Sequence, residues 1–160
     1  MISAGLFSSD CRIFPGSRLR MRNSLPLDGA RGERRSCQVY LENTGMEKAL
    51  TCRLDAIAPE GVHVRIRRVG GVTIPHHNTD TPASDLDGLG RVPGVVPDIL
   101  YNESELVVSS GGTGLFWITV EIESDAHTGP NTVELILDAE GKATHLSLDV
   151  EVYDINLAPR

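Results

Sequence analysis

The chain has 160 residues, of which 40% are hydrophobic and 23% are charged, and its net charge is −7 at pH 7. This length suits one domain with a single core, so we expect residues 1–160 to form one unit. The acidic balance argues against a fold-wide nucleic-acid surface, because such surfaces depend on clustered Lys and Arg. No apolar run reaches the ~20 residues needed to cross a bilayer, so no membrane partner is expected. The first ten residues lack the pattern of a signal peptide, which predicts a cytoplasmic location if Met1 is the native start.

The first half of the chain reads as short strands with alternating polarity. In residues 36–42 and 49–57 every second side chain is apolar, and a turn with Gly45 separates the two runs. Residues 62–69 follow the same rule, with Val64 and Ile66 on one face and Arg65 and Arg67 on the other. This arginine cluster and an earlier one at residues 31–35 are typical of a solvated strand face.

Four further strands are expected after residue 104, in residues 105–109, 115–123, 131–139 and 145–155. The sequence Asp138 to Lys142 predicts a tight turn between the last two strands. No segment has a helical period. The fold class expected from seven or eight short strands is therefore all-β, an antiparallel two-sheet sandwich of immunoglobulin-like or jelly-roll-like type with one long ordered loop.

The three cysteines, Cys11, Cys37 and Cys52, make an odd count and include no C-x-x-C motif. If the turn at residues 43–48 joins a hairpin, pairing Leu41 with Leu50 buries more apolar surface than a register that brings Cys37 and Cys52 together. We therefore expect Cys37 and Cys52 to be buried free thiols in one hairpin.

The strand pattern breaks between Gly70 and about Asn102, a stretch far longer than the ~4–6 residues of an ordinary connection. Four of the nine prolines lie in it, and they are expected to keep this backbone out of the sheets. Its apolar residues, among them Ile74 and Val96, are expected to anchor it to the sandwich. The sequence thus predicts an ordered polar excursion.

This excursion contains the residues that invite a site. His76, His77 and Asp80, with Asp85 and Asp87 nearby, are metal-ligand types. Adjacent side chains on an extended chain point to opposite sides, so a polar network that holds the loop, or contact with a partner domain, is favoured over zinc or calcium. No metal, cofactor or catalytic residue is expected. A hydrolase that uses a carboxylate pair from the loop stays an alternative, drawn from Asp80, Asp85, Asp87 and Asp98.

Trp117 is the single tryptophan, and it is out of phase with the apolar side chains of its strand. It is therefore expected to face outward. One interpretation places it beneath the long loop or against a neighbouring domain. The alternative is a platform on which a sugar ring stacks, as in carbohydrate-binding sandwiches.

Four segments are distinctive when they are taken in order: "LDGARGERRSCQVYLENTG" at 27–45, "VRIRRVGGVTIPHHNTDTP" at 64–82, "VPDIL" at 96–100 and "FWITVEIESDAHTGPNTVELIL" at 116–137. Together they resemble the N-terminal β-sandwich domain of glycoside hydrolase family 123-like bacterial proteins. The resemblance implies that hydrolysis of terminal β-linked N-acetylgalactosamine belongs to a downstream (β/α)₈ barrel with an adjacent Asp-Glu pair. This sequence contains no Asp-Glu dipeptide and lacks the ≈ 250 residues of a barrel.

The expected function is therefore that of a non-catalytic N-terminal accessory module that supports or docks on the catalytic barrel in the same polypeptide. An independent carbohydrate-binding module with a glycan as partner is the alternative. The resemblance implies that the loop motif is an ordered surface near the barrel, and we add His77 and Trp117 to it. The predicted interface comprises Pro75, His76, His77, Asn78, Thr79, Asp80, Thr81, Pro82 and Trp117.

Overall fold

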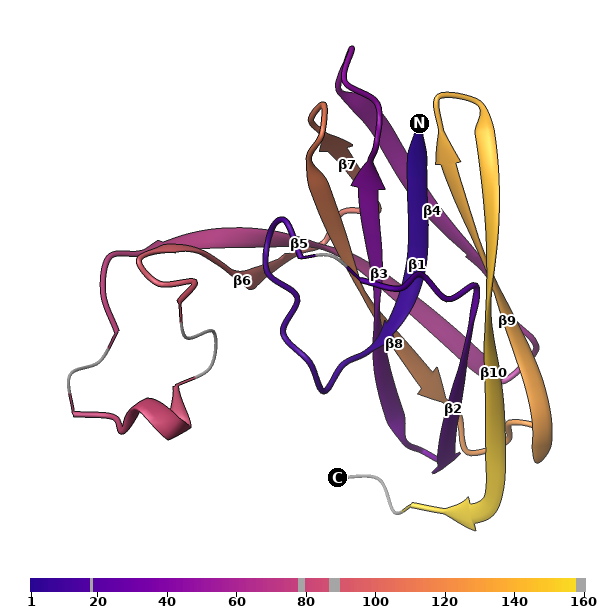
Figure 1. The fold of residues 1–160 in the computed structure, drawn as a ribbon. Helices are drawn as coiled ribbons and strands as arrows, with labels where there is room; N and C mark the ends of the chain where they lie inside the picture. Colours follow the sequence, from indigo (N-terminus) through magenta and orange to yellow (C-terminus); the bar gives the residue numbers. More distant parts are fainter. Residues whose placement is uncertain (18, 78–79, 87–89, 158–160) are drawn as a thin grey trace.

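The computed structural model describes residues 1–17, 19–77, 80–86 and 90–157 as two five-stranded sheets packed face to face, with one 3₁₀ turn at Ala83–Asp85 (Figure 1). The predicted all-β sandwich is confirmed. Sheet A contains, in spatial order, β1 (Ile2–Ser8), β3 (Arg34–Asn43), β8 (Thr113–Ile122), β5 (Val62–Ile74) and β6 (Gly94–Tyr101). Sheet B contains, in the same way, β2 (Ser24–Arg31), β10 (Lys142–Asn156), β9 (Gly129–Ala139), β4 (Leu50–Ile57) and β7 (Glu105–Val108).

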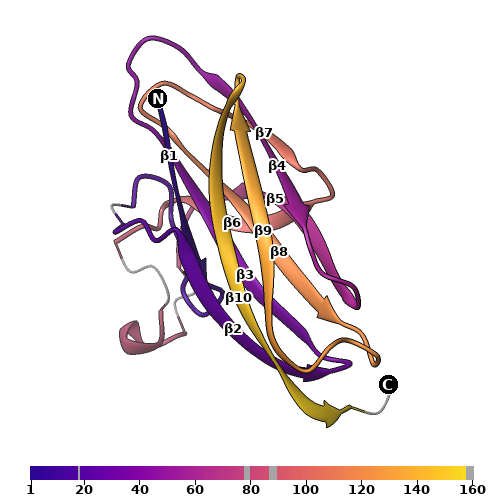
Figure 2. The same cartoon turned by 90° about the vertical axis from the view of Figure 1, so that its right-hand side faces the viewer.

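One strand pair runs parallel, which corrects the expectation of an antiparallel fold throughout. β10 lies between β2 and β9, antiparallel to β9 and parallel to β2 (Figure 2). The other pairs among the described strands are antiparallel. β2 and β10 are far apart in sequence, and no hairpin joins them to impose opposite directions. Both β1 and β2 went unpredicted.

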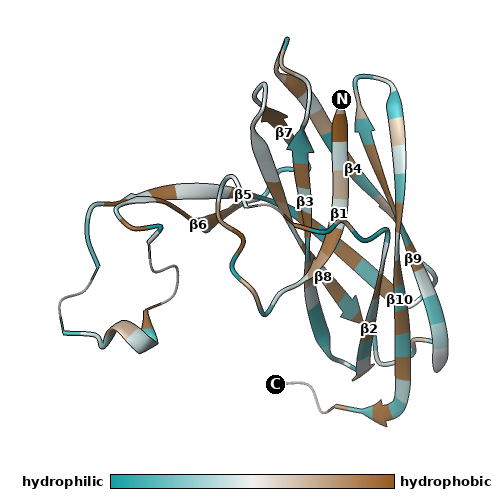
Figure 3. Ribbon diagram, in the orientation of Figure 1, coloured by the Kyte–Doolittle hydropathy of each residue, from teal (hydrophilic) through white to brown (hydrophobic). Residues whose placement is uncertain are grey.

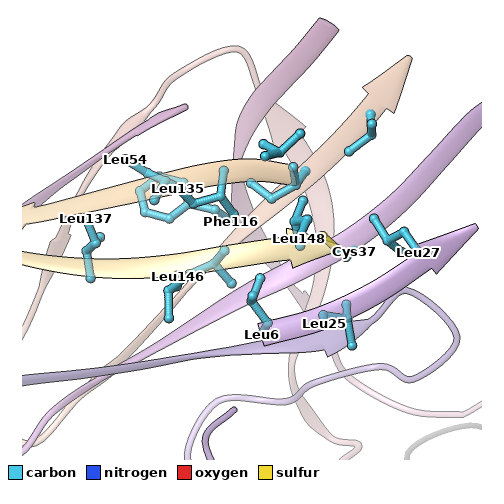
Figure 4. Packing of buried hydrophobic residues seen from close by; sticks show 14 of the residues in the cluster. Leu6, Leu25, Leu27, Cys37, Leu54, Phe116, Leu135, Leu137, Leu146 and Leu148 are labelled. Carbon is cyan, nitrogen blue, oxygen red and sulfur yellow. The ribbon is translucent and has the colours of Figure 1, made fainter. Parts of the chain in front are cut away.

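The core fills the space between the sheets with aliphatic side chains. Leu6 and Phe116 of sheet A lie opposite Leu135, Leu146 and Leu148 of sheet B (Figure 4). The alternation expected in β8, β9 and β10 is confirmed, and it appears as alternating polar and apolar bands along β10 (Figure 3). With few aromatics in the chain, burial of Leu, Val and Ile provides most of the driving force for folding.

The predicted turn between β9 and β10 is also confirmed. Ala139 pairs with Lys142, and the two residues between them, Glu140 and Gly141, have φ of 54° and 85°. Positive φ at both central positions matches the right-handed twist of the two strands. The carboxylate of Asp138 accepts a hydrogen bond from the Gly141 amide at 3.1 Å.

The turn at residues 43–48 does not close a hairpin, so the expected pairing of Leu41 with Leu50 is wrong. β3 lies in sheet A and β4 in sheet B, and the segment between them crosses from one sheet to the other. Asn43 holds this crossing, because its buried side-chain amide donates to the carbonyls of Lys48 (2.9 Å) and Val108 (3.3 Å). Local alternation cannot distinguish a hairpin from a crossing, because both bury the same side of each strand.

Cys37 and Cys52 are buried free thiols, as expected, although they lie in different sheets. Cys11 is free and exposed. Burial raises the pKa of Cys37 to about 12. The pKa of Cys52 rises to about 11, first because of burial and then because of the nearby acids Glu140 and Asp138. Neither thiol is a nucleophile near neutral pH, since the thiolate is the reactive form.

The polar excursion is partly strand. β5 continues through Gly70 to Ile74, and β6 pairs with it from Gly94 to Tyr101. We call the described residues 70–77, 80–86 and 90–101 the arm, which projects sideways from the sandwich (Figure 1). The expectation that prolines keep this backbone out of the sheets is wrong for Pro97, because β6 is an edge strand and only one of its sides is paired.

The outer face of sheet A carries a second, smaller apolar cluster. Ile13, Tyr40 and Leu115 are buried there, with Met21 and Val69 packed against them. Residues 9–17 and 19–22, here called the cover segment, lie over this face between β1 and β2. The Tyr40 hydroxyl donates to the Ser17 carbonyl at 2.6 Å and fixes the segment.

A glycine in β1 allows the cover segment to pass closely. A Cβ at Gly5 would lie 2.9 Å from both the Cα and the Sδ of Met21. The Leu6 amide donates to the Arg22 carbonyl at 2.9 Å, so the cover segment also occupies part of the free edge of β1. The cover segment therefore shields both a face and an edge of sheet A.

Candidate functional site

The described residues of the predicted loop motif, Pro75, His76, His77, Asp80, Thr81 and Pro82, lie at the far end of the arm (Figure 1). Pro75, His76 and Asp80 are exposed, and His77 is half-buried. Asn78 and Thr79 are outside the described residues, as is Asp87 of the alternative carboxylate and metal sets. The interface role of all these residues stays a prediction. Within residues 1–17, 19–77, 80–86 and 90–157, no three His, Cys, Asp or Glu side chains gather closely enough to hold a metal ion. The remaining members of the predicted motif, Thr81 and Pro82, precede the 3₁₀ turn.

Trp117 lies on the outer face of sheet A, with Gln38 of β3 on one side and Arg67 of β5 on the other. Its ring is half-buried, and it borders a cavity of about 340 Å³. The cover segment, rather than the far end of the arm, provides one wall, and β6 provides another. The lining residues are Ser9, Asp10, Cys11, Arg12, Ile13, Gln38, Val69, Pro97, Asp98, Leu100, Leu115 and Trp117.

Gln38 shapes this cavity from within the sheet. It is 3% exposed, although it belongs to the outward-facing set of β3. Its amide nitrogen donates to the carbonyls of Ser8 (2.9 Å) and Cys11 (2.8 Å), which holds the first turn of the cover segment in place. Sequence reasoning missed this role. The available signal was a glutamine between Cys37 and Val39 in the apolar middle of the strand.

A second cavity of about 270 Å³ adjoins the first, because Arg12 and Asp98 line both. His76 and His77 reach this second cavity from the arm. The Nε2 atom of His77 is buried and has no hydrogen-bond partner among the described residues. The two cavities adjoin at Arg12 and Asp98, between the cover segment and the arm, with Trp117 bordering one and the loop histidines bordering the other; together they are here called the groove.

The edge strand β6 exposes large apolar side chains. Val95, Ile99, Leu100 and Tyr101 are between 37% and 47% exposed. The expectation that apolar residues anchor the excursion to the sandwich is therefore wrong for Val95, Ile99 and Leu100. Among the described apolar residues of the arm only Val96 is buried. The arm projects away from the sandwich, so no part of sheet B covers it (Figure 1).

The root of the arm is built around Gly70 and Gly71, where the pairing of β5 with β6 shifts register. A Cβ at Gly70 would lie 2.4 Å from Tyr101, and one at Gly71 would lie 2.3 Å from Val95. The Arg68 guanidinium stacks over the Tyr101 ring at 4.1 Å and contacts Glu103 at 2.7 Å. These contacts fix the direction in which the arm leaves the sandwich.

The two arginine clusters form local pairs, as a solvated strand face requires. Glu121 lies within 3.5 Å of both Arg34 and Arg65. Arg67 donates to the Thr119 hydroxyl at 3.0 Å, while its Nε is buried without a hydrogen-bond partner in the described part of the chain. The remaining pairs join Arg31 to Asp154, Arg35 to Glu33 and Arg68 to Glu103. The described residues also form no helix long and apolar enough to span a membrane.

No protein-family model matches the chain, and no curated protein sequence matches it either. Among solved structures, a family 123 glycoside hydrolase from Clostridium perfringens, described in a study of glycolipid glycan hydrolysis, aligns with 98% of this chain at a TM-score of 0.69 and 16% identity. This chain covers 28% of that glycoside hydrolase. The N-terminal domain of PorA aligns with 94% of this chain at a TM-score of 0.41 and 7% identity, and 97% of that domain is covered.

The first of these likenesses shows the fold. At 16% identity, a TM-score of 0.69 over nearly the whole chain means that one region of the glycoside hydrolase shares this sandwich. The fold alone does not identify a function, because the same sandwich supports many unrelated functions.

Proposed function

We propose that this chain is a non-catalytic accessory domain that docks on the catalytic (β/α)₈ domain of a glycoside hydrolase-like polypeptide. The docking surface is the arm, with the apolar side chains of β6 in the contact and the motif at residues 75–82 beside them. The loop motif acts in this proposal as an ordered polar surface and performs no bond cleavage.

The exposed apolar surface of β6 carries this proposal. A two-stranded ribbon is marginally stable in water by itself, and this ribbon leaves the sandwich while presenting Val95, Ile99 and Tyr101 to solvent. Exposed apolar patches of this kind are typical of protein–protein contacts. The fold match to 28% of a glycoside hydrolase supports a neighbouring domain of the same polypeptide as the partner.

The edge of β6 also suits contact through side chains rather than through added strands. Pro97 and the register shift at Gly70 and Gly71 interrupt the regular ladder, which disfavours open-ended pairing with another chain. The absence of an Asp-Glu dipeptide from the sequence supports the assignment of chemistry to another domain.

The test compares the 160-residue chain with a natural polypeptide that continues beyond Arg160 into a catalytic domain. Amide hydrogen exchange of residues 94–101 is expected to slow in the longer polypeptide. The substitution Ile99→Asp places a charge in the contact and should restore the faster exchange without unfolding the sandwich.

Val107→Asp is the matched control, because Val107 is 64% exposed on the edge strand of sheet B. It should leave the exchange of residues 94–101 unchanged. Equal exchange of the arm in the two polypeptides would contradict the docking proposal.

A further inference from the structure

We propose that the cavity over Trp117 binds a neutral saccharide, with the indole ring as the stacking surface and the Asp98 carboxylate as a hydrogen-bond acceptor. This inference goes beyond the accessory role and holds for the isolated chain. It concerns the groove between the cover segment and the arm, whereas docking rests on Val95, Ile99 and Tyr101 of β6, which line neither of the two cavities.

The geometry combines a ring with apolar walls. Trp117 lies at one side of the cavity, and Ile13, Leu100 and Leu115 are part of the lining. The volume of about 340 Å³ lies within the ~300–1,000 Å³ of small-molecule sites. The adjoining cavity of about 270 Å³ extends the groove, so more than one sugar ring has room. A pyranose ring has an apolar face that packs on an indole, and its hydroxyls remain free for polar partners.

Two polar groups along the groove have no partner among the described residues. Asp98 lines both cavities and forms no hydrogen bond or ion pair with any described residue. His77 Nε2 is buried in the adjoining cavity, and its hydrogen-bonding capacity is also unused within the described ranges. Of the two, His77 Nε2 is the buried atom, and buried polar groups normally have partners, whereas Asp98 is exposed and offers its carboxylate at the mouth of the groove. The hydroxyl groups of a saccharide provide both donors and acceptors, so one ligand satisfies both groups.

The charges around Trp117 disfavour strongly charged ligands of either sign. Asp10 and Asp98 bring two carboxylates to the cavity, Arg12 brings a guanidinium to the same lining, and Arg67 is the neighbour of Trp117 on β5. This near balance disfavours phosphate-rich ligands, which need a cationic surface, and lysine-rich peptides, which need an anionic one. Hydrogen bonds between charged side chains and neutral hydroxyls remain favourable.

The cavity contains two reporters for a direct test. Trp117 is the single tryptophan, so its fluorescence reports on this site alone. Cys11 lines the same cavity and is the exposed thiol among the three cysteines. We expect at least one neutral glycan on a glycan array to bind the 160-residue chain. That glycan, used as the probe, should shift Trp117 fluorescence and slow alkylation of Cys11.

Two variants locate the binding. Asp98→Asn keeps the shape of an exposed side chain and should weaken binding of the probe glycan by about tenfold, as expected for loss of a charge-assisted hydrogen bond. Trp117→Ala should abolish binding on the array. Trp117→Phe keeps an aromatic face, and it should retain part of the affinity if the alanine variant is poorly folded.

Asp149→Asn is the matched control, because Asp149 is an exposed carboxylate on the outer face of sheet B. It should bind the probe as the unmodified chain does. The proposal is overturned if the array yields no glycan, if binding survives both Trp117→Ala and Asp98→Asn, or if the groove selects a lysine-rich peptide instead. None of these outcomes bears on docking, which is measured by exchange at residues 94–101.

Discussion

The two sheets differ most in what lies on their outer faces. On sheet B the outward side chains of β10 are polar or charged, including Ser147, Asp149 and Glu151, and the alternation is regular from strand to strand (Figure 3). On sheet A the residues from Cys37 to Leu41 in β3 are all buried, so this part of the strand is covered on both faces. The cover segment and the arm account for the difference.

This difference indicates that the candidate binding surfaces lie on the outer face of sheet A rather than on that of sheet B. A sheet with one dry and one wet face needs no cover beyond its partner sheet, and sheet B has this form. Sheet A uses its outer face for a second apolar cluster and for the groove beside Trp117. Both proposals, docking and saccharide binding, therefore concern the side of sheet A.

The largest effect is expected from Tyr40→Ala, compared with Tyr153→Ala on sheet B. Tyr40 is 1% exposed, and its ring meets Phe7 edge to face at 6.1 Å. Loss of a buried aromatic side chain should lower the free energy of unfolding by about 3–5 kcal/mol. Tyr153 is 46% exposed, so its truncation should cost about 0.5 kcal/mol. Urea denaturation measures both values.

Equal losses for the two tyrosines would mean that the cover segment does not pack on sheet A. Tyr40→Phe sharpens the result, because it removes only the hydrogen bond to the Ser17 carbonyl. It should cost about 1 kcal/mol.

A smaller effect is expected from Gly5→Ala, which tests the close passage of the cover segment over β1. The added methyl group would meet the Met21 backbone, which has no flexible end to move aside. Overpacking should cost about 1–3 kcal/mol and speed the amide exchange of residues 19–22. Ser3→Ala on the same strand is the control, since it adds no atom. Unchanged exchange in Gly5→Ala would contradict the close approach.

The smallest effect is expected from Glu134→Gln on the outer face of sheet B. Glu134 contacts the His145 ring at 2.6 Å, and both side chains are well exposed to solvent. Exposed polar contacts contribute little, and even a fully charged exposed pair contributes roughly 0–1 kcal/mol, because solvent screens it. Thermal unfolding of the variant should stay close to that of the unmodified chain. A large loss would show that the outer face of sheet B carries more of the stability than its exposure implies.

Sheet B was the easier half to predict. β9 and β10 alternate strictly, and the Glu140–Gly141 turn between them has the positive φ values that its sequence suggests. β2 was not predicted, because Pro26 and Gly29 interrupt its alternating pattern, although Leu25 and Leu27 point inward. Its partner β10 lies far away in sequence, so the pairing of the two strands cannot be predicted from a local sequence pattern.

Sheet A was harder because its central strands, β3 and β8, are buried on both faces along much of their length. The alternating pattern in β3 correctly predicted its inward residues. It did not predict that the outward residues Gln38 and Tyr40 are also buried. The arm was expected to be unpaired because four prolines lie in it, although Pro97, like Gly70 and Gly71, stands within the β5–β6 ladder. They are tolerated where an edge strand crosses close to its neighbour.

The candidate site was partly visible in the sequence. Trp117 was expected to face outward, and it borders a cavity on the outer face of sheet A. Its walls could not be anticipated, because Asp10 and Arg12 come from a segment without regular structure and Asp98 comes from the arm. The cover segment, the arm and the strand of Trp117 meet only in the folded protein, so their proximity cannot be read from the sequence.

The position of β10 between β2 and β9 has a consequence for synthesis. Ser24 of β2 pairs with Ser147 of β10, which the ribosome adds 123 residues later. At about 5–20 residues per second, this delay amounts to roughly 6–25 s. During that interval the nascent β2 has no backbone partner in its own sheet. Sheet B can therefore be completed only after β10, the last strand in the sequence, has been synthesised.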